Sequence, residues 1–121
     1  DIQDIDAKFT LLYFWEPDCG FCKTATPKLM EIFNNYEDKG VIVIAANTRL
    51  DKDAWSKFIA EHELTWINVY SPLHVREMLA DYEAFSTPKL FILDKDKKIV
   101  AKDINVDQCP EVLDHLLKLN Q

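Results

Sequence analysis

The feature that most constrains this chain is a pair of cysteines placed directly after an apolar run. Residues 11–15 read Leu-Leu-Tyr-Phe-Trp, which suits a strand buried on both faces of a parallel sheet, although a short buried helix would show the same run. The next residues, Glu16-Pro17-Asp18, end a strand because proline cannot donate to a strand ladder. Cys19 then stands where a helix begins, and Cys22 follows about one helical turn later.

This placement favours thiol–disulfide exchange. The free N–H groups and the dipole at a helix N-terminus stabilise a thiolate, so Cys19 is the candidate nucleophile. Cys22 is close enough to close a small disulfide ring and is the candidate resolving thiol. A zinc site would need a second ligand pair, but Cys109 and the three histidines form no second CxxC or HxxxH. A structural disulfide with so short a loop would gain little chain entropy. The redox interpretation is therefore preferred.

The surroundings of the cysteines resemble the active-site segment of the thioredoxin superfamily. Residues 14–23 read Phe-Trp-Glu-Pro-Asp-Cys-Gly-Phe-Cys-Lys, and Pro27 sits where thioredoxins carry a kink-forming proline. Ser86-Thr87-Pro88, followed by an apolar segment at 89–94, is similar to the superfamily's cis-proline loop and the strand after it. The similarity runs from about Lys8 to Leu119 and is greatest to the TlpA/ResA-like envelope oxidoreductases, particularly the modules common in Bacteroidetes.

The resemblance also implies which residues shape the site. It implies a cis bond between Thr87 and Pro88, lying against the cysteine pair, with the Thr87 backbone open to an extended substrate peptide. It places Trp15 beside the cysteines, and Phe21 between them influences their reduction potential. We therefore predict two catalytic residues, Cys19 and Cys22, and five residues that bind substrate or shape the site: Trp15, Glu16, Phe21, Thr87 and Pro88.

One position departs from the thioredoxin pattern. Tyr13 stands six residues before Cys19, where thioredoxins usually carry a buried aspartate that helps to move protons. Glu16 and Asp18 are the nearest carboxylates, and each is compatible with a substitute role or with an ordinary solvated turn. Lys23 would favour a thiolate electrostatically, but an ordinary helix-surface lysine is the preferred interpretation.

The remaining patterns predict an α/β thioredoxin-like fold, with a central mixed sheet of about five strands and helices on both faces. An inserted strand–helix unit includes Thr65–Ser71. The predicted strands are Thr10–Trp15, Val41–Ala46, Trp66–Tyr70, Leu90–Leu93 and Lys98–Lys102. The first predicted helix runs from Cys19 or Gly20 to about Lys39 and is ended by Gly40. A second is capped by Asp51 and has Trp55, Phe58, Ile59 and His62 at helical spacing, and a third begins at Ser71-Pro72 and has Val75, Met78, Leu79 and Tyr82 on one face. The last runs from about Pro110 to Leu119, with Val112, Leu113, Leu116 and Leu117 facing inward.

Length and charge narrow the class of protein. With 121 residues the chain suits one domain, which we assign to residues 1–121. Its net charge of −7 argues against nucleic acid and against an anionic membrane surface as partners. No apolar run suits a signal peptide or a membrane span, so no direct membrane insertion is expected from this segment. Since the chain begins at Asp1 without Met, we leave room for a removed leader or an upstream domain, and the resemblance implies a bacterial periplasm or cell envelope.

These observations predict an enzyme, a protein disulfide oxidoreductase that cycles Cys19 and Cys22. Reduction is preferred to oxidation or isomerisation, with protein disulfides as substrates, an upstream dithiol donor as partner, and no cofactor or metal. The alternative is a thioredoxin-fold module that acts as a peroxidase or only recruits proteins. A peroxidase would want a lone cysteine near Thr and Arg, whereas Arg49 and Arg76 lie far from Cys19 in sequence. Cys109 has no partner spacing and is expected to be a free thiol.

Overall fold

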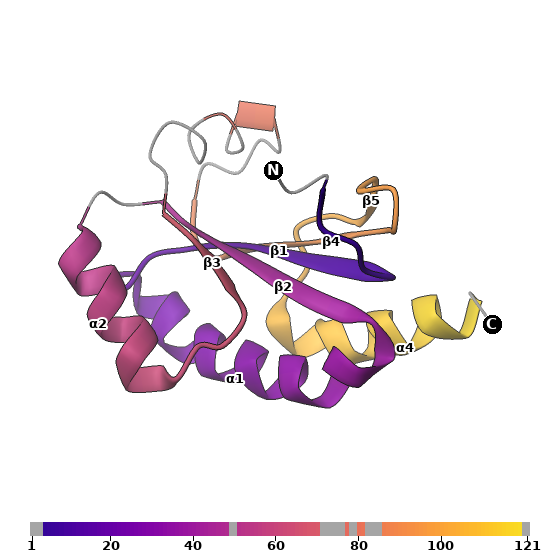
Figure 1. Ribbon diagram of the computed structural model, residues 1–121, viewed down its shortest axis with the longest axis horizontal. Helices are drawn as coiled ribbons and strands as arrows, with labels where there is room; N and C mark the ends of the chain where they lie inside the picture. The colour runs from indigo at the N-terminus through magenta and orange to yellow at the C-terminus, as the bar shows by residue number, and fades with distance from the viewer. Residues whose placement is uncertain (1–3, 49–50, 71–76, 78–79, 82–85, 120–121) are drawn as a thin grey trace.

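A five-stranded mixed sheet forms the centre of the protein (Figure 1). The computed structural model describes residues 4–48, 51–70, 77, 80–81 and 86–119. The sheet has the order β3-β2-β1-β4-β5, with β1 parallel to β2 and β2 parallel to β3, while β4 runs antiparallel to both β1 and β5. The strands are β1 (Phe9–Trp15), β2 (Val41–Asn47), β3 (Ile67–Val69), β4 (Lys89–Leu93) and β5 (Ile99–Ala101). Each predicted strand is present, and no strand end is shifted by more than one residue.

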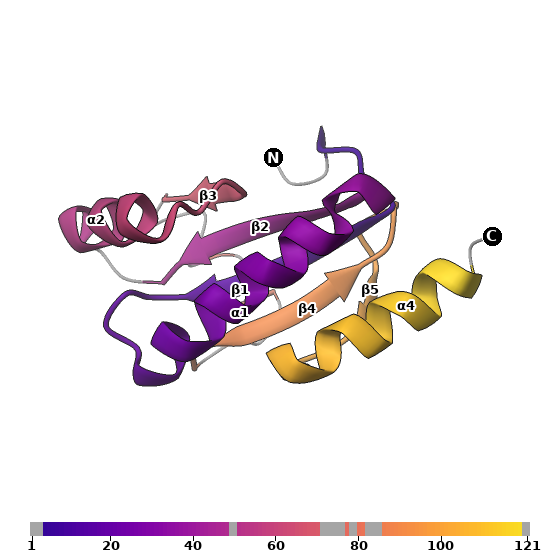
Figure 2. The same cartoon turned by 90° about the horizontal axis from the view of Figure 1, so that it is seen from below.

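Helices lie along one face of this sheet, where α1 and α4 run side by side (Figure 2). The helices are α1 (Gly20–Tyr36), α2 (Lys52–His62) and α4 (Cys109–Leu119), and the 3₁₀ turns are η2 (Glu37–Lys39) and η3 (Val106–Gln108). On the opposite side, Glu77, Ala80 and Asp81 are helical. The rest of the predicted helix begun by Ser71-Pro72, including its apolar face, lies outside the described residues.

The chain ends α1 earlier than the pattern predicted. The α-helix stops at Tyr36, and η2 carries the chain on to Lys39, because the last turn tightens into 3₁₀ geometry. Gly40 then adopts a left-handed φ of 87°. A Cβ at Gly40 would also lie 2.9 Å from the Lys8 side chain, so the glycine is required for both reasons.

The other helix predictions hold with small differences. Asp51 caps α2 by accepting a hydrogen bond from the Ala54 N–H at 3.0 Å, as predicted. His62 is exposed and stacks on Phe58, with 4.0 Å between ring centres. The last helix, α4, begins at Cys109, one residue before the predicted start, and of its predicted inward residues only Leu113 is fully buried. No helix among the described residues is long and apolar enough to cross a membrane.

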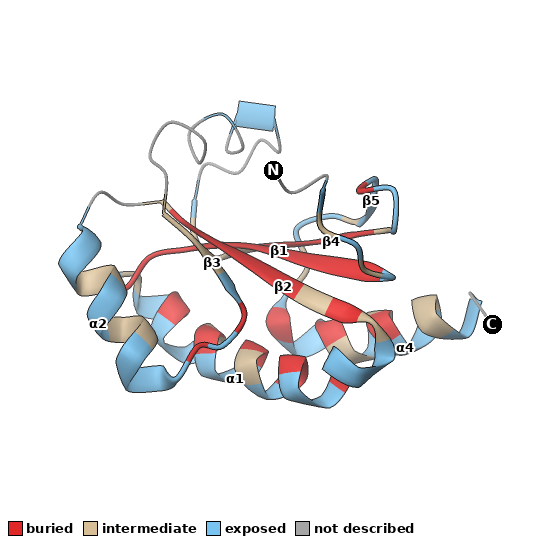
Figure 3. Ribbon diagram, in the orientation of Figure 1, coloured by how far each residue is buried: buried red, intermediate tan, exposed pale blue. Residues whose placement is uncertain are grey.

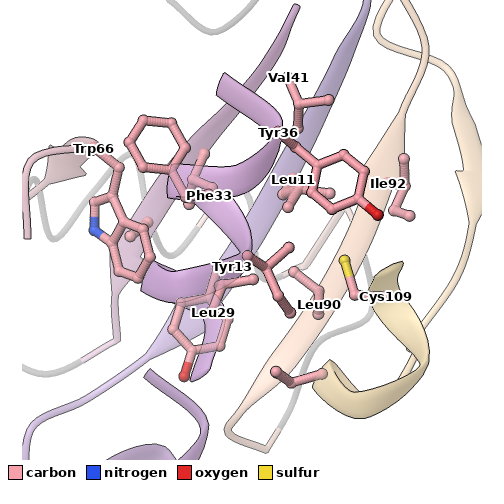
Figure 4. Packing of buried hydrophobic residues seen from close by; sticks show 14 of the residues in the cluster. Leu11, Tyr13, Leu29, Phe33, Tyr36, Val41, Trp66, Leu90, Ile92 and Cys109 are labelled. Atoms are coloured by element: carbon pink, nitrogen blue, oxygen red, sulfur yellow. The ribbon is translucent and has the colours of Figure 1, made fainter. Parts of the chain in front are cut away.

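The core lies on both faces of β1, whose seven residues are all buried (Figure 3). Successive side chains of a strand point to opposite faces. Leu11, Tyr13 and Trp15 accordingly join the cluster under the helices, whereas Leu12 and Phe14 join the cluster on the other face. Figure 4 shows the first cluster, in which α1 packs its buried apolar side chains against β1 and β4.

The register of the sheet determines where the ends of β1 and β4 meet in space, and it thereby positions the site. In the antiparallel pair of β1 and β4, Phe14 lies opposite Lys89. The carboxyl end of β1 is therefore beside the amino end of β4. The cysteine pair follows the first of these ends and Thr87-Pro88 precedes the second, so segments almost 70 residues apart in sequence are brought together.

Candidate functional site

Cys19 lies at the tip of α1 and is half-exposed. Its Sγ accepts a hydrogen bond from the Cys22 backbone N–H at 3.1 Å, which satisfies one of the free donors of the first turn. The Cys19 thiol also donates to the Thr87 carbonyl oxygen at 3.4 Å. Cys19 therefore presents an accessible sulfur, held by backbone groups from two segments, and this geometry suits an attacking thiol.

Cys22 lies one turn deeper and is completely buried. Burial raises the pKa of its thiol to about 12, and the hydrogen bond with the Cys19 side chain also raises this pKa. Hydrogen bonds from the Glu16 backbone and the Thr87 side chain act in the opposite direction. Cys22 is therefore a protonated, shielded thiol at neutral pH, placed to act after Cys19.

Thr87 and Pro88 lie at the mouth of the site, both half-buried. The peptide bond between them is cis. The Thr87 carbonyl faces Cys19, and Pro88 forms part of a cavity wall next to Phe21. The structure thus brings the Ser86-Thr87-Pro88 loop to the cysteine helix.

The other predicted site residues occupy different environments. Trp15 is fully buried, with its ring centre 5.1 Å from that of Phe58. Glu16 is also buried, and Thr48 Oγ1 donates to its Oε2 at 3.3 Å, so Glu16 is not a solvated turn residue. Phe21 is the opposite case, because 80% of its surface is exposed beside the cysteines.

The two remaining charged candidates lie at the surface. Asp18 and Lys23 are both exposed. The lysine therefore fits the preferred interpretation of an ordinary helix-surface residue, and of the two nearby carboxylates only that of Glu16 is buried.

A cavity of about 390 Å³ opens beside the first turns of α1. Its apolar wall includes Phe21, Ala25, Pro88, Leu90, Ile104 and Val106. Two ion pairs lie at its edge, Lys28 with Asp107 at 3.2 Å and Lys89 with Asp103 at 2.9 Å. A cavity with this lining can receive an apolar side chain of an extended peptide.

A buried hydroxyl pair behind the cysteines is the feature that sequence reasoning missed. Tyr13 Oη and Thr26 Oγ1 lie 2.8 Å apart, and both residues are fully buried. Burial raises the pKa of the Tyr13 phenol above its ordinary value of 10.0. In the sequence, Tyr13 stands out only as a departure from the usual aspartate. The signal that could have revealed the pair is Thr26, a polar residue four positions after Cys22 on the buried face of the helix.

In the described part of the chain, no group of three or more His, Cys, Asp or Glu residues is arranged to hold a metal ion.

The chain is similar in sequence to curated thiol–disulfide oxidoreductases. The thioredoxin-like family matches residues 6–99. The thiol-disulfide oxidoreductase ResA of Bacillus thuringiensis is 27% identical over 121 residues, which covers 98% of this chain and 66% of that protein. The thiol-disulfide oxidoreductase YkuV of Bacillus subtilis is 31% identical over 100 residues, covering 77% of this chain and 64% of YkuV. The chain thus spans just under two thirds of the length of these relatives.

Solved structures agree with this assignment. A domain of a possible thiol-disulfide isomerase from Cytophaga hutchinsonii superposes with a TM-score of 0.87 and 35% identity, covering 97% of this chain and 80% of that one. The thioredoxin domain of a thiol-disulfide oxidoreductase from Bacteroides vulgatus superposes with a TM-score of 0.84 and 27% identity, covering 93% and 81%. The predicted thioredoxin-like fold is therefore confirmed.

Proposed function

This chain belongs to the thioredoxin-like family, and on that premise we propose that it reduces disulfide bonds in protein substrates by cycling Cys19 and Cys22 between dithiol and disulfide. The observation that carries the proposal is the difference between the two thiols. Cys19 is half-exposed at the helix tip, whereas Cys22 is buried one turn behind it. An accessible attacking thiol with a shielded partner is the arrangement that thiol–disulfide exchange needs.

The reaction proceeds in two exchanges. The Cys19 thiolate attacks one sulfur of the substrate disulfide, and the other substrate sulfur leaves, which forms a mixed disulfide. Cys22 then attacks the Cys19 sulfur, releases the second substrate thiol and closes the Cys19–Cys22 disulfide. An upstream dithiol donor returns the pair to the reduced state.

The remaining site residues orient the substrate. In this proposal the backbone at Thr87 pairs with an extended peptide, and Pro88 and Phe21 line the cavity that receives a neighbouring apolar side chain. Trp15 and Glu16 hold the end of β1 from which the cysteine turn departs. We further propose that residues 1–121 act as one domain on substrates in a bacterial periplasm or cell envelope, a compartment where protein disulfides persist.

Insulin reduction with dithiothreitol as donor tests this function. We expect the wild-type protein to accelerate insulin precipitation, the Cys19→Ser variant to be inactive, and the Cys109→Ala variant to match the wild type. The Cys22→Ser variant should instead accumulate a mixed disulfide through Cys19, detectable by non-reducing electrophoresis and mass spectrometry. A wild-type protein that captures partners but does not reduce insulin would contradict the reductase and favour a recruiting module.

A further inference from the structure

The second exchange places an unusual demand on Cys22. A thiolate, rather than a thiol, must attack the Cys19 sulfur. Cys22 has no exposed surface, and its burial opposes the charged form. A polar group that stabilises the thiolate as it forms is therefore needed inside the protein.

The hydroxyl pair of Tyr13 and Thr26 is located on the correct face of α1. Thr26 follows Cys22 by four residues, and residues with this spacing are neighbours on a helix surface. Tyr13 reaches the same face from β1, with its Oη 2.8 Å from Thr26 Oγ1. Its ring is held by packing, stacked on Trp15 and edge-on to Trp66. The phenol oxygen is thereby fixed next to the turn that carries Cys22.

The phenol of Tyr13 keeps its proton at neutral pH. Burial raises the pKa of Tyr13 above 10.0, and negative charge on Cys22 or Cys19 raises this pKa further. The groups that face Cys22 are the Cys19 thiol, the Glu16 backbone and Thr87, in addition to Tyr13. Among these groups, Tyr13 combines a neutral hydroxyl with complete burial, so it can donate a hydrogen bond from inside the protein.

We propose that the Tyr13 hydroxyl donates a hydrogen bond to the Cys22 thiolate as the mixed disulfide is resolved, and that Thr26 positions this hydroxyl. This inference rests on the proposed dithiol cycle. Either oxygen of the pair can be the donor. While Cys22 is a neutral thiol, Tyr13 donates to Thr26; once the thiolate forms, Thr26 donates to Tyr13 and Tyr13 turns its hydrogen toward the sulfur. The exchange proceeds by rotation of the two hydroxyl hydrogens.

The step balances within the mixed disulfide. The Cys22 sulfur forms a bond with the Cys19 sulfur, the bond between Cys19 and the substrate sulfur breaks, and the departing sulfur takes the electron pair. The proton lost by Cys22 ends on that departing sulfur, which leaves as a thiol. The two cysteines are oxidised, the substrate is reduced, and Tyr13 and Thr26 keep their own protons.

The two exchanges can be followed separately with one equivalent of an aromatic disulfide that releases a coloured thiol at each step. The first release reports attack by Cys19, and the second reports resolution by Cys22. For Tyr13→Phe we expect the second release to slow about tenfold or more at neutral pH, since a hydrogen bond to a charged group shifts a pKa by about one unit or more. The first release should change far less, and the deficit in the second should persist from neutral to mildly alkaline pH.

Three further variants separate this role from a structural one. Thr26→Val, which is similar in shape but lacks the hydroxyl, should slow the second release, whereas Thr26→Ser should restore it. Tyr36→Phe is the matched control, because it removes a phenol oxygen from the far end of α1 and should leave both releases unchanged. If Tyr13→Phe does not fold, the comparison of Thr26→Val with Thr26→Ser decides the question.

The outcomes distinguish the two proposals. If the rate of the second release in Tyr13→Phe, or in Thr26→Val, equals the rate in Tyr36→Phe across the pH range, the hydroxyl role is overturned. The dithiol cycle is left intact by that result. A wild-type protein with no first release contradicts the dithiol cycle itself, and this inference with it.

Discussion

Two helices in this protein begin at a cysteine, yet the two cysteines lie in different surroundings. Cys19 is the N-cap of α1 and is half-exposed, whereas Cys109 is the first residue of α4 and is completely buried. Although Cys109 lies at a helix N-terminus, burial raises the pKa of its thiol to about 12. A helix N-terminus therefore does not by itself lower the pKa of a thiol whose sulfur is buried.

The segments before the two helices explain the difference. The turn at Glu16-Pro17-Asp18 carries Cys19 beyond the end of β1, and the Cys19 side chain itself accepts the hydrogen bond of the first turn. Before α4, Asn105 and Gln108 form a capping box around η3. This capping box satisfies donors of η3, and the Cys109 N–H donates to the Val106 carbonyl. Among the described residues, the Cys109 side chain takes part in no capping bond and packs as a small apolar group against the core.

Cys22 and Cys109 differ in another way. Burial raises the pKa of both thiols to about 12. Around Cys22, however, hydrogen bonds from the Glu16 backbone and Thr87 lower the pKa and so favour the thiolate. The pKa of Cys109 is shifted by burial, with no such opposing hydrogen bond from the part of the chain that the structure describes. Two equally buried thiols can therefore have different uses, depending on the polar groups beside them.

The largest effect that this comparison predicts is in alkylation. Iodoacetamide added to the reduced protein at mildly acidic pH should modify Cys19 before Cys22 and Cys109, as measured by peptide mass spectrometry. If exposing Cys109 requires local unfolding that costs about 3 kcal/mol, its alkylation slows about a hundredfold. Denaturant should abolish the difference, which is the control. Early modification of Cys109 in the folded protein would mean that the comparison is wrong.

The fold and the cysteine pair could be predicted from sequence because their signals are local. The apolar run of β1, the proline turn and the helical spacing of α1 each lie within a few residues. The contact of Thr87 with Cys19 was different, since the register of β1 against β4 joins residues 68 positions apart. Only the resemblance to thioredoxins indicated it.

Other parts of the site could not be predicted because they depend on three-dimensional packing. Glu16 lies beside a proline turn, which is compatible with a solvated carboxylate, and its burial follows from the placement of Thr48 after β2. The pair of Tyr13 and Thr26 forms between a strand and a helix. Its members are ordinary core positions until the helix is docked on the sheet.

A second prediction concerns stability in alkali. Cys109 has a folded pKa of about 12 against an ordinary value of 9.0, so its burial stabilises the fold fully below pH 9.0 and this stability is lost as pH rises toward 12. Each such thiol should lower the free energy of unfolding by about 1.4 kcal/mol per pH unit in that window.

Urea unfolding at stepped pH, with reductant present, measures this slope. Below pH 9.0, the free energy of unfolding of Cys109→Ala should differ from that of the wild type by a constant amount. Above pH 9.0, it should decline less steeply with pH than that of the wild type. The free energy of unfolding of that variant should still decline with pH because of Cys22, since burial raises the pKa of the Cys22 thiol to about 12 as well. Parallel curves above pH 9.0 would show that Cys109 ionises as readily in the folded as in the unfolded chain.

The smallest predicted effect is on stability, at Tyr36, which lies where the end of α1 meets the start of α4. This residue is nearly buried, and its hydroxyl donates to Asp114 Oδ1 at 2.5 Å and to the Pro110 carbonyl at 3.3 Å, joining α1 to α4. Asp114 is exposed and can be rehydrated once the hydroxyl is lost. Tyr36→Phe should therefore lower the free energy of unfolding by only about 0.5–1.5 kcal/mol, measured by urea unfolding.

The same variant should not change disulfide exchange. Tyr36 is the last residue of α1, about 25 Å from Cys19 along the helix axis at 1.5 Å per residue, and its hydroxyl contacts α4 rather than the cysteine turn. Loss of the α1–α4 hydrogen bond thus weakens the region around Cys109 without altering the donors around Cys22. If Tyr36→Phe slowed exchange as much as Tyr13→Phe, the position of α4 would control the reactivity of the cysteine pair, and the two ends of α1 would have to be treated as one coupled unit.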